Sequence, residues 1–393
     1  MDMFDYEKEH LDILRSRLGE CCVLLKKDGV FPLPAACNIA AFGNGVRHTV
    51  KGGTGSGEVN SRFTITAEQG LKNAGFTIVT DSWLDAYDSI RIKAHKQFLK
   101  RIKREAHKAH TPAVLYSMGA VMPEPEYELS TDIVSDTAGG ECNTCIYVLA
   151  RNSGEGSDRK DIAGDFRLTE SEIRDILKLN DYYPRFMLVL NVGAPVDLAP
   201  VKDVKNILLL SQLGALTGTA LSDILLGRTV PSGKLADTWS SMEDYCPDID
   251  FGNSDDTSYN EGIYVGYRYF DKTGKKALFP FGFGLSYTEF SFKDTKVTIG
   301  DRPDKVVVNA SVTNTGSFPG REVMQVYVSC PEGSLDKPYQ DLAAFSKTSL
   351  LAPGASEDIS AVFCLSDLAS YDTVQSAYIL EKGRYYIRAG VSS

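Results

Sequence analysis

The sequence predicts two parts of different fold class: an α/β domain over residues 1–290 and an all-β sandwich over residues 291–393. In the first part, short apolar runs alternate with helical patterns, which is typical of parallel strands that are buried on both faces. In the second part, polar and apolar residues alternate along short runs that are separated by turn signals. The period of the apolar pattern therefore changes at about residue 291.

Length, composition and charge limit the classes of function. A chain of 393 residues can hold two or three domains with cores of their own. Hydrophobic residues make up 43% and charged residues 24%, which are ordinary values for a globular protein. The formal net charge of −10 argues against a general affinity for nucleic acid or anionic membrane, although it leaves room for a local basic patch. We therefore expect no nucleic-acid or membrane partner.

The cysteines and the N-terminal segment predict a cytoplasmic protein. Several of the eight cysteines lie inside apolar runs, as reduced and buried thiols do. Cys142 and Cys145 form a C-x-x-C pair, but neither a second pair nor a spaced His accompanies it, so a position leading into a strand is favoured over a zinc or redox site. Residues 1–7 are acidic and lack the basic and apolar segments of a signal peptide. We expect no metal and no cofactor.

The first part has five candidate strands. Helical segments separate them, and Thr169 with Glu172 marks one helix start as a capping box, followed by the apolar stripe Ile173, Ile176 and Leu177. Such alternation predicts an α/β sheet with right-handed crossovers. The expected strands are 38–42, 76–79, 146–150, 186–191 and 207–210.

Segment 91–108 is strongly basic, with eight Lys or Arg residues against one Glu. Phe98, Leu99, Ile102 and Ala106 recur there at helical spacing. A nucleic-acid-binding helix and an exposed amphipathic face both fit this pattern, and the acidic balance of the remaining chain favours the exposed face.

The second part shows the rhythm of a β-sandwich. Alternating runs at 305–312 and 324–328 are separated by turn signals at 314–316 and 352–354. Just before this part, segment 261–287 is dense in aromatic residues and glycine. Aromatic faces serve sugar-binding clefts and domain interfaces alike, and we expect packing at an interface.

Glu155 is the strongest candidate for chemistry. It follows the apolar run 145–149 and lies between Gly154 and Gly156, so a thin loop presents one carboxylate where a buried strand ends. Ligands of open α/β sheets bind beyond the carboxyl ends of the strands, and a carboxylate there can act as general acid or base. A solvated loop in which Asp158 pairs with Arg159 fits the same residues.

Two glycine-rich stretches follow the first predicted strand. Residues 43–48 resemble the start of a dinucleotide fingerprint without its third glycine, and residues 51–58 lack the ending of a P-loop. A G-x-S-x-G serine hydrolase motif is also missing there. For residues 51–58, a flexible surface loop and a loop that approaches a ligand or a neighbouring domain both remain open. His48 fits either a base or a structural hydrogen-bonding residue.

The motifs and their order along the chain resemble those of glycoside hydrolase family 3, the β-glucosidase family. The tail resembles the fibronectin-III-like module of that family, through residues 312–316 and 320–323. The resemblance covers nearly the whole chain. The matching segments of the first part are 23–33, 48–57, 153–156, 231–235, 261–269 and 279–288.

The resemblance implies an α/β sandwich with a mainly parallel six-stranded sheet over residues 1–290, followed by a fibronectin-III-like β-sandwich over residues 291–393. It also implies that Glu155 is the acid/base residue of a retaining glycosidase acting on a β-linked glucoside or oligosaccharide. The residues expected to lie at the substrate or at a domain interface are Arg47, His48, Lys51, Ser153, Asp158 and Arg159.

The chain departs from the family in one respect: no TIM barrel is recognisable in the sequence. The family's nucleophile is an aspartate on such a barrel, which needs about 250 residues. Asp81 follows the second predicted strand in a motif of different order, so we do not assign it this role. The expected function is the acid/base half of a β-glucosidase, inactive alone, with a barrel in the same gene product or in a separate chain. A non-catalytic carbohydrate-binding or scaffold protein is the alternative, and a nucleotide-binding protein using residues 43–57 is a second.

Overall fold

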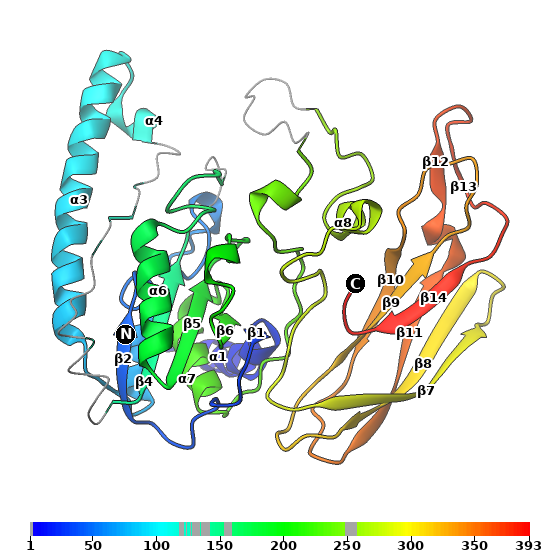
Figure 1. Cartoon of the computed structure of the whole chain (residues 1–393), viewed down its shortest axis with the longest axis horizontal. Coiled ribbons are helices and arrows are strands. Elements are labelled where there is room, and N and C mark those ends of the chain that lie inside the picture. The colour runs from blue at the N-terminus through cyan, green and yellow to red at the C-terminus, as the bar shows by residue number, and fades with distance from the viewer. Residues whose placement is uncertain are drawn as a thin grey trace. The chain divides into compact units, whose positions relative to one another are not determined.

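The computed structural model describes residues 3–117, 122, 124–125, 127, 134, 142–152, 159–247 and 258–393. The chain forms two compact units, Met1–Pro231 and Ser232–Ser393. Figure 1 shows an α/β arrangement in the first unit and antiparallel strands in the second. The predicted fold class, α/β followed by all-β, is confirmed.

The first unit contains a six-stranded sheet with the order β1-β6-β5-β4-β2-β3. Neighbouring strands from β3 to β6 are parallel, whereas β1 pairs with β6 in the antiparallel direction. The mainly parallel six-stranded sheet is thus confirmed, with one antiparallel strand at its edge. The strands are β1 (Val23–Lys26), β2 (Asn38–Phe42), β3 (Thr77–Ile78), β4 (Thr144–Ala150), β5 (Arg185–Asn191) and β6 (Ile207–Leu209).

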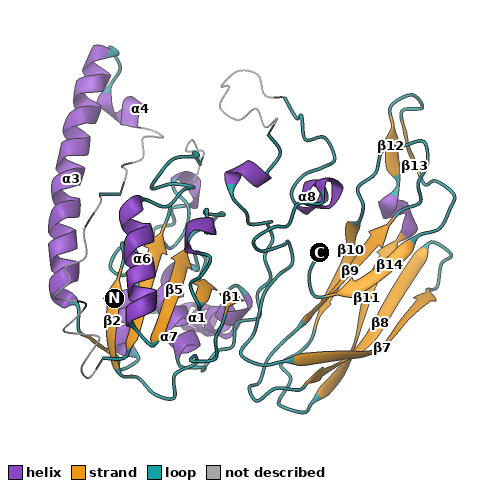
Figure 2. Cartoon of the chain, in the orientation of Figure 1, coloured by secondary structure: helices purple, strands orange, loops and turns teal. Residues whose placement is uncertain are grey.

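Helices cover the sheet of the first unit, and α6 packs against β5 (Figure 2). Helix α6 begins with the predicted capping box, since Thr169 Oγ1 accepts from the Glu172 amide and Glu172 Oε2 accepts from the Thr169 amide. No helix in the described part is both long and apolar enough to cross a membrane. The helices are α1 (Asp5–Arg17), α2 (Ala67–Asn73), α3 (Asp81–Lys108), α4 (Ala113–Ser117), α6 (Glu170–Tyr182) and α7 (Thr217–Leu225), with short 3₁₀ turns at Leu18–Glu20, Gly55–Gly57, Ala199–Val201 and Gly214–Leu216.

The core of the first unit follows from the composition of its strands. Every residue of β4 is buried, and the side chains of Ile146, Leu149 and Leu188 are fully buried. Helices α2 and α7 approach closely because each carries a glycine at the contact. A Cβ on Gly70 would lie 2.0 Å from the carbonyl oxygen of Gly218.

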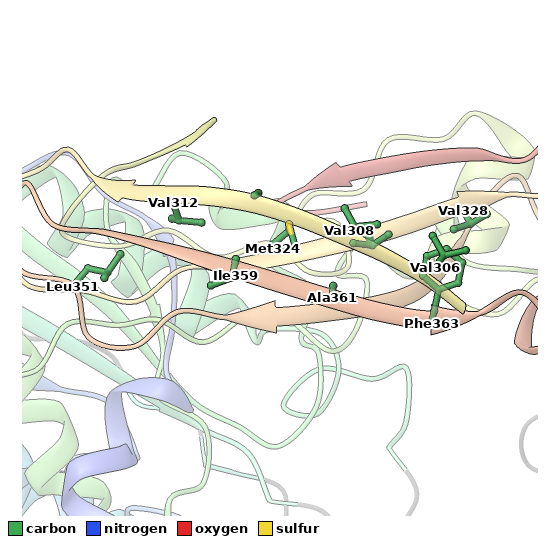
Figure 3. Packing of buried hydrophobic residues seen from close by; sticks show 11 residues of the cluster. Val306, Val308, Val312, Met324, Val328, Leu351, Ile359, Ala361 and Phe363 are labelled. Carbon is green, nitrogen blue, oxygen red and sulfur yellow. The ribbon is translucent and has the colours of Figure 1, made fainter. Parts of the chain in front are cut away.

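The second unit is a β-sandwich with α8 (Tyr267–Thr273) and a 3₁₀ turn at Met242–Asp244 ahead of it. Figure 3 shows Val308, Met324 and Phe363 in the core, contributed by β8, β9 and β11. Its main sheets have the orders β10-β9-β14 and β11-β8-β7, and β12 pairs with β13. The strands are β7 (Phe290–Ile299), β8 (Lys305–Asn314), β9 (Val323–Ser329), β10 (Asp341–Lys347), β11 (Ser356–Cys364), β12 (Ser370–Asp372), β13 (Ala377–Ile379) and β14 (Tyr386–Gly390), with a 3₁₀ turn at Leu365–Leu368.

The aromatic segment 261–287 packs within the second unit. The rings of Tyr267 and Phe281 stack with centroids 4.9 Å apart, and the ring of Tyr327 on β9 lies edge-on to Tyr267 at 6.0 Å. The side-chain amide of Gln325 donates to the carbonyl of Gly282 at 2.9 Å. The compact units therefore divide at residues 231 and 232, whereas the domain boundary at 290 stays a prediction drawn from the sequence pattern.

Candidate active site at the carboxyl ends of the strands

The loop that leaves β2 crosses onto the end of β4. Gly43 has φ +93°, and a Cβ there would lie 2.4 Å from the carbonyl oxygen of Val148, so glycine is needed for the approach. The amide of Gly45 donates to that same oxygen at 3.0 Å. The Asn44 side chain accepts from the Ala150 amide at 2.8 Å and donates to the Ala150 carbonyl at 3.1 Å. Residues 43–45 are thus tied to the end of β4.

Asn191, the last residue of β5, joins three loops at the same edge of the sheet. Its Oδ1 accepts from the Val50 amide at 2.6 Å, and its Nδ2 donates to the carbonyl of Val50 at 2.9 Å and of Ser211 at 2.7 Å. The side chain is fully buried. The Gly214 amide donates to the Lys51 carbonyl at 2.8 Å, so the loops after β2, β5 and β6 form one connected surface.

Arg151 fixes the chain directly after β4. Its side chain is only 4% exposed, and Nη2 donates to Glu172 Oε2 at 2.6 Å. Burial by itself would lower the pKa of Arg151, but the carboxylate of Glu172 outweighs it and the net shift of the pKa is upward. Nε of Arg151 also donates to the backbone carbonyl of Asp165 at 3.1 Å. The guanidinium is therefore charged and held in one position.

Asp165 also binds the residues that directly follow segment 153–158. Its carboxylate accepts from Nε of Arg159 and, at 2.7 Å, from the backbone amide of Lys160. Because Arg151 binds the backbone of the same residue, one turn holds both ends of this segment. Ser153, Glu155 and Asp158 themselves lie outside the described residues, so their roles stay predictions.

Arg47 and His48 meet at one carboxylate. Arg47 contacts Glu68 at 3.2 Å, Asp85 at 2.7 Å and Asp88 at 3.0 Å, and Nε2 of His48 lies 2.7 Å from Asp88 Oδ1. Burial would raise the pKa of Asp88, but hydrogen bonds with His48 and Arg47 outweigh it and the net pKa is lowered. Arg47 is thus occupied in joining the β2 loop to α2 and α3. His48 is 37% exposed and oriented by Asp88, as a base or a structural residue would be.

The remaining predicted residues lie apart from this pair. Nζ of Lys51 donates to the Val59 carbonyl at 2.5 Å and lies 3.5 Å from Ser61 Oγ. Nη2 of Arg159 is buried and makes no hydrogen bond to any described residue. Within the described ranges, no hydrogen bond or ion pair joins Arg159 to Arg47, His48 or Lys51.

Sequence reasoning missed several residues that organise this edge. Asp81, Asp85 and Asp88 recur at i, i+4 and i+7, and this spacing could have revealed a carboxylate face on α3. Asn191 lies at the end of a predicted strand, which is a weaker signal for a residue at this edge. No sequence signal pointed to Asp165. All eight cysteines, Cys142 and Cys145 among them, are free thiols. Among the residues that the structure describes, no cluster of three or more His, Cys, Asp or Glu could hold a metal.

Comparison with known families identifies both parts of the chain. The model of the glycosyl hydrolase family 3 C-terminal domain matches residues 22–287, which is more than half of the chain. The chain belongs to glycosyl hydrolase family 3. A fibronectin type III-like domain model matches residues 322–393. The resemblance inferred from the motifs is therefore confirmed.

Members of family 3 that resemble this chain are longer. It is 34% identical to beta-glucosidase A of Butyrivibrio fibrisolvens over 98% of this chain and 50% of that protein. It is 32% identical to a beta-glucosidase of Ruminococcus albus, covering 97% of this chain and 39% of that protein. Beta-glucosidase 3B from Thermotoga neapolitana, in complex with alpha-D-glucose, superposes with a TM-score of 0.82 at 33% identity over 98% of this chain and 53% of that one. The chain spans about half the length of these relatives or less.

Proposed function

We propose that this chain supplies the general acid/base of a retaining β-glucosidase, with Glu155 as the proton donor and the nucleophile on a TIM-barrel domain. The observation that carries the proposal is the anchoring of segment 153–158. This segment follows β4 directly, and Asp165 binds both of its flanks, through Arg151 on one side and Arg159 on the other. The segment thus leaves and rejoins the described chain at the sheet edge where ligands of α/β proteins bind.

The proposed reaction has two steps. The barrel nucleophile attacks the anomeric carbon while Glu155 donates its proton to the departing glycosidic oxygen, which breaks the bond to the aglycone. Glu155 then takes a proton from water, the water oxygen attacks the anomeric carbon, and the bond to the nucleophile breaks. A retaining mechanism requires the two carboxyl groups to be about 5–5.5 Å apart, so a barrel has to close against this edge of the sheet. Such closure removes water, which raises the pKa of a carboxyl group and favours its acid form.

The residues around the edge have supporting roles in this proposal. Arg47, His48, Lys51, Ser153, Asp158 and Arg159 are assigned to the substrate or to the interface with the barrel. Arg47 is saturated by carboxylates, so it positions the β2 loop and does not bind sugar itself. Arg159 directly follows segment 153–158 in the sequence, and its Nη2 makes no hydrogen bond to a described residue, so this donor is available in the proposal.

The alternative is a non-catalytic carbohydrate-binding or scaffold protein of the same family. It predicts binding of sugar, or none, without turnover in any combination of chains. We also infer a cytoplasmic location, for which the support is that all eight cysteines are free thiols.

The test is an assay of an aryl β-glucoside with the chain alone and with a barrel domain added in trans. The barrel portion of the Butyrivibrio relative is a suitable partner, because that protein is 34% identical over the shared part. We expect negligible turnover by either protein alone and turnover by the mixture. Strong turnover by this chain alone would contradict the division of the catalytic carboxylates between two domains.

A further inference from the structure

Helix α3 carries a row of cations that the proposed function does not use. Segment 91–108 has a net charge of +7, which leaves −17 for the rest of a chain whose total is −10. Six of its cations are exposed and make no ion pair with any residue that the structure describes. We call this row the cationic ridge: Lys93, Lys96, Lys100, Lys103, Arg104 and Lys108.

The cationic ridge lies on the solvent side of α3. Ile102 and Ala106, which are buried, occupy the opposite face of the helix. The ridge covers residues 93–108, about 22 Å of helix at 1.5 Å per residue. Lys96, Lys100, Arg104 and Lys108 follow one another at i, i+4 spacing, where like charges destabilise a helix. This arrangement opposes folding, so it is better explained by a partner that neutralises it.

Exposed apolar side chains accompany the ridge. On α3 itself, Ile92 is 57% and Leu99 is 42% exposed. Helix α4 lies next to the C-terminal end of α3 (Figure 1), and on it Val114 is 76% and Leu115 is 57% exposed. A row of cations beside exposed aliphatic side chains is typical of helices that lie at a membrane interface.

We propose that α3 and α4 form a docking face for a bilayer that contains anionic phospholipid. Its headgroups would neutralise the cationic ridge, and its acyl boundary would receive the exposed aliphatic side chains. A nucleic-acid backbone offers phosphates but no apolar surface for Ile92 and Leu99. A protein partner would need a groove matched to the convex outer face of a single helix, whereas a bilayer adapts to it.

The net charge of the chain does not oppose this contact. Charges are screened over roughly 8–10 Å at moderate salt, so a bilayer at the ridge interacts mainly with local cations. The sequence-based expectation of no membrane partner rested on the total charge of −10. Segment 91–108, which carries the cationic ridge, is positively charged instead.

The first test is co-sedimentation of the full chain with vesicles of phosphatidylcholine, with and without phosphatidylglycerol. We expect binding only to vesicles with phosphatidylglycerol and release at raised salt. The variant K96E/K100E/R104E should bind at least about 100-fold more weakly, since each cation at an anionic surface contributes about 1 kcal/mol. The matched control K276E/K293E/K296E changes the total charge equally, at exposed lysines of the second unit, and should bind as the unchanged chain does.

A second variant separates lipid from other polyanions. I92S/L99S keeps every charge, so it should weaken vesicle binding while leaving any binding to duplex DNA unchanged. Circular dichroism checks that each variant is folded. The proposal is overturned if the chain does not bind the anionic vesicles at low salt, if the control triple variant loses binding equally, or if I92S/L99S binds unchanged while duplex DNA binds more tightly than the vesicles.

Discussion

At the scale of single residues, the candidate site depends on charges that are held by buried or half-buried partners. Arg151 and Glu172 form a pair 2.6 Å apart with side chains only 4% and 9% exposed. Asp165 accepts hydrogen bonds from Arg151 before segment 153–158 and from Arg159 after it. These contacts fix the chain where β4 ends, which is the requirement for presenting a proton donor at a defined place.

Arg151→Met should lower the free energy of unfolding by about 3–5 kcal/mol, because it leaves the Glu172 carboxylate buried without its partner. Urea denaturation measures this loss. The control is Arg302→Met, which removes an ion pair of 3.4 Å with side chains 62% and 44% exposed. That change should cost less than about 1 kcal/mol. Equal losses in the two variants would show that the Arg151 pair is no more important than a surface pair.

Asp88→Asn should reduce the dependence of the free energy of unfolding on pH in the acid range. The pKa of Asp88 is lowered in the folded chain, so its contribution is present above the unfolded value of about 3.9 and is lost as the pH falls through the folded pKa. The variant should therefore be less stable than the unchanged chain at neutral pH, and the difference should vanish in acid. Thermal unfolding across this pH range measures it.

Asp271→Asn should change the free energy of unfolding at neutral pH in the opposite direction to Asp88→Asn. Burial raises the pKa of Asp271, with smaller opposing contributions from Gln340 and Arg388. Its charged form is therefore unfavourable in the folded chain at neutral pH, and the variant should gain stability there and lose that gain on acidification. A difference of the same sign for Asp88 and Asp271 would contradict the assignment of their environments.

At the scale of elements, apolar runs predicted the parallel strands well, because strands buried on both faces are apolar throughout. The run 38–42 is β2 itself, and β4 and β5 begin only a residue or two earlier than expected. Strand β1 was not recognised from its pattern, since a run of four residues at a sheet edge has little periodicity. The contacts at the strand ends could not be predicted, because Asn191 and Val50 are 141 residues apart in the sequence.

Gly70→Ala tests the packing of α2 on α7. The added methyl would lie 2.0 Å from the backbone oxygen of Gly218, and backbone atoms cannot rotate away as a side chain does. We expect a loss of about 3 kcal/mol in the free energy of unfolding. Gly57→Ala is the matched control, because a Cβ there meets nothing within 4 Å. If both variants are equally stable, the two helices are not in close contact.

At the scale of the whole molecule, the sequence located the change of fold class but not the division into compact units. The aromatic segment 261–287 belongs to the α/β part by family resemblance, yet it packs on the sandwich. Gln325 binds the backbone of Gly282, and Arg268 forms an ion pair with Asp341. Side-chain pairing between such distant segments leaves no periodic signal in the sequence.

A chain of residues 232–393 should therefore fold cooperatively, and a chain of residues 291–393 should be much less stable. The shorter chain lacks the Lys234–Glu322 pair at 2.7 Å and the Gln325–Gly282 bond. At about 1 kcal/mol for each of these two polar contacts and about 4–8 °C for each kcal/mol, its Tm should fall by about 8–16 °C. Calorimetry measures both transitions, and equal Tm values would place the boundary of the folding unit at 290.

The most direct measurement concerns Glu155 in the assembly of this chain with a barrel domain. Hydrolysis is compared for aryl β-glucosides with a poor and with a good leaving group, using Glu155→Gln and, as the matched control, Glu9→Gln at an exposed position of α1. A general acid contributes about 10²–10⁴-fold, so the Glu155 variant should lose activity by that factor on the poor leaving group and far less on the good one. The control should cleave both as the unchanged assembly does. If Glu155→Gln leaves cleavage of the poor leaving group unchanged, Glu155 is not the proton donor and the proposed function is wrong.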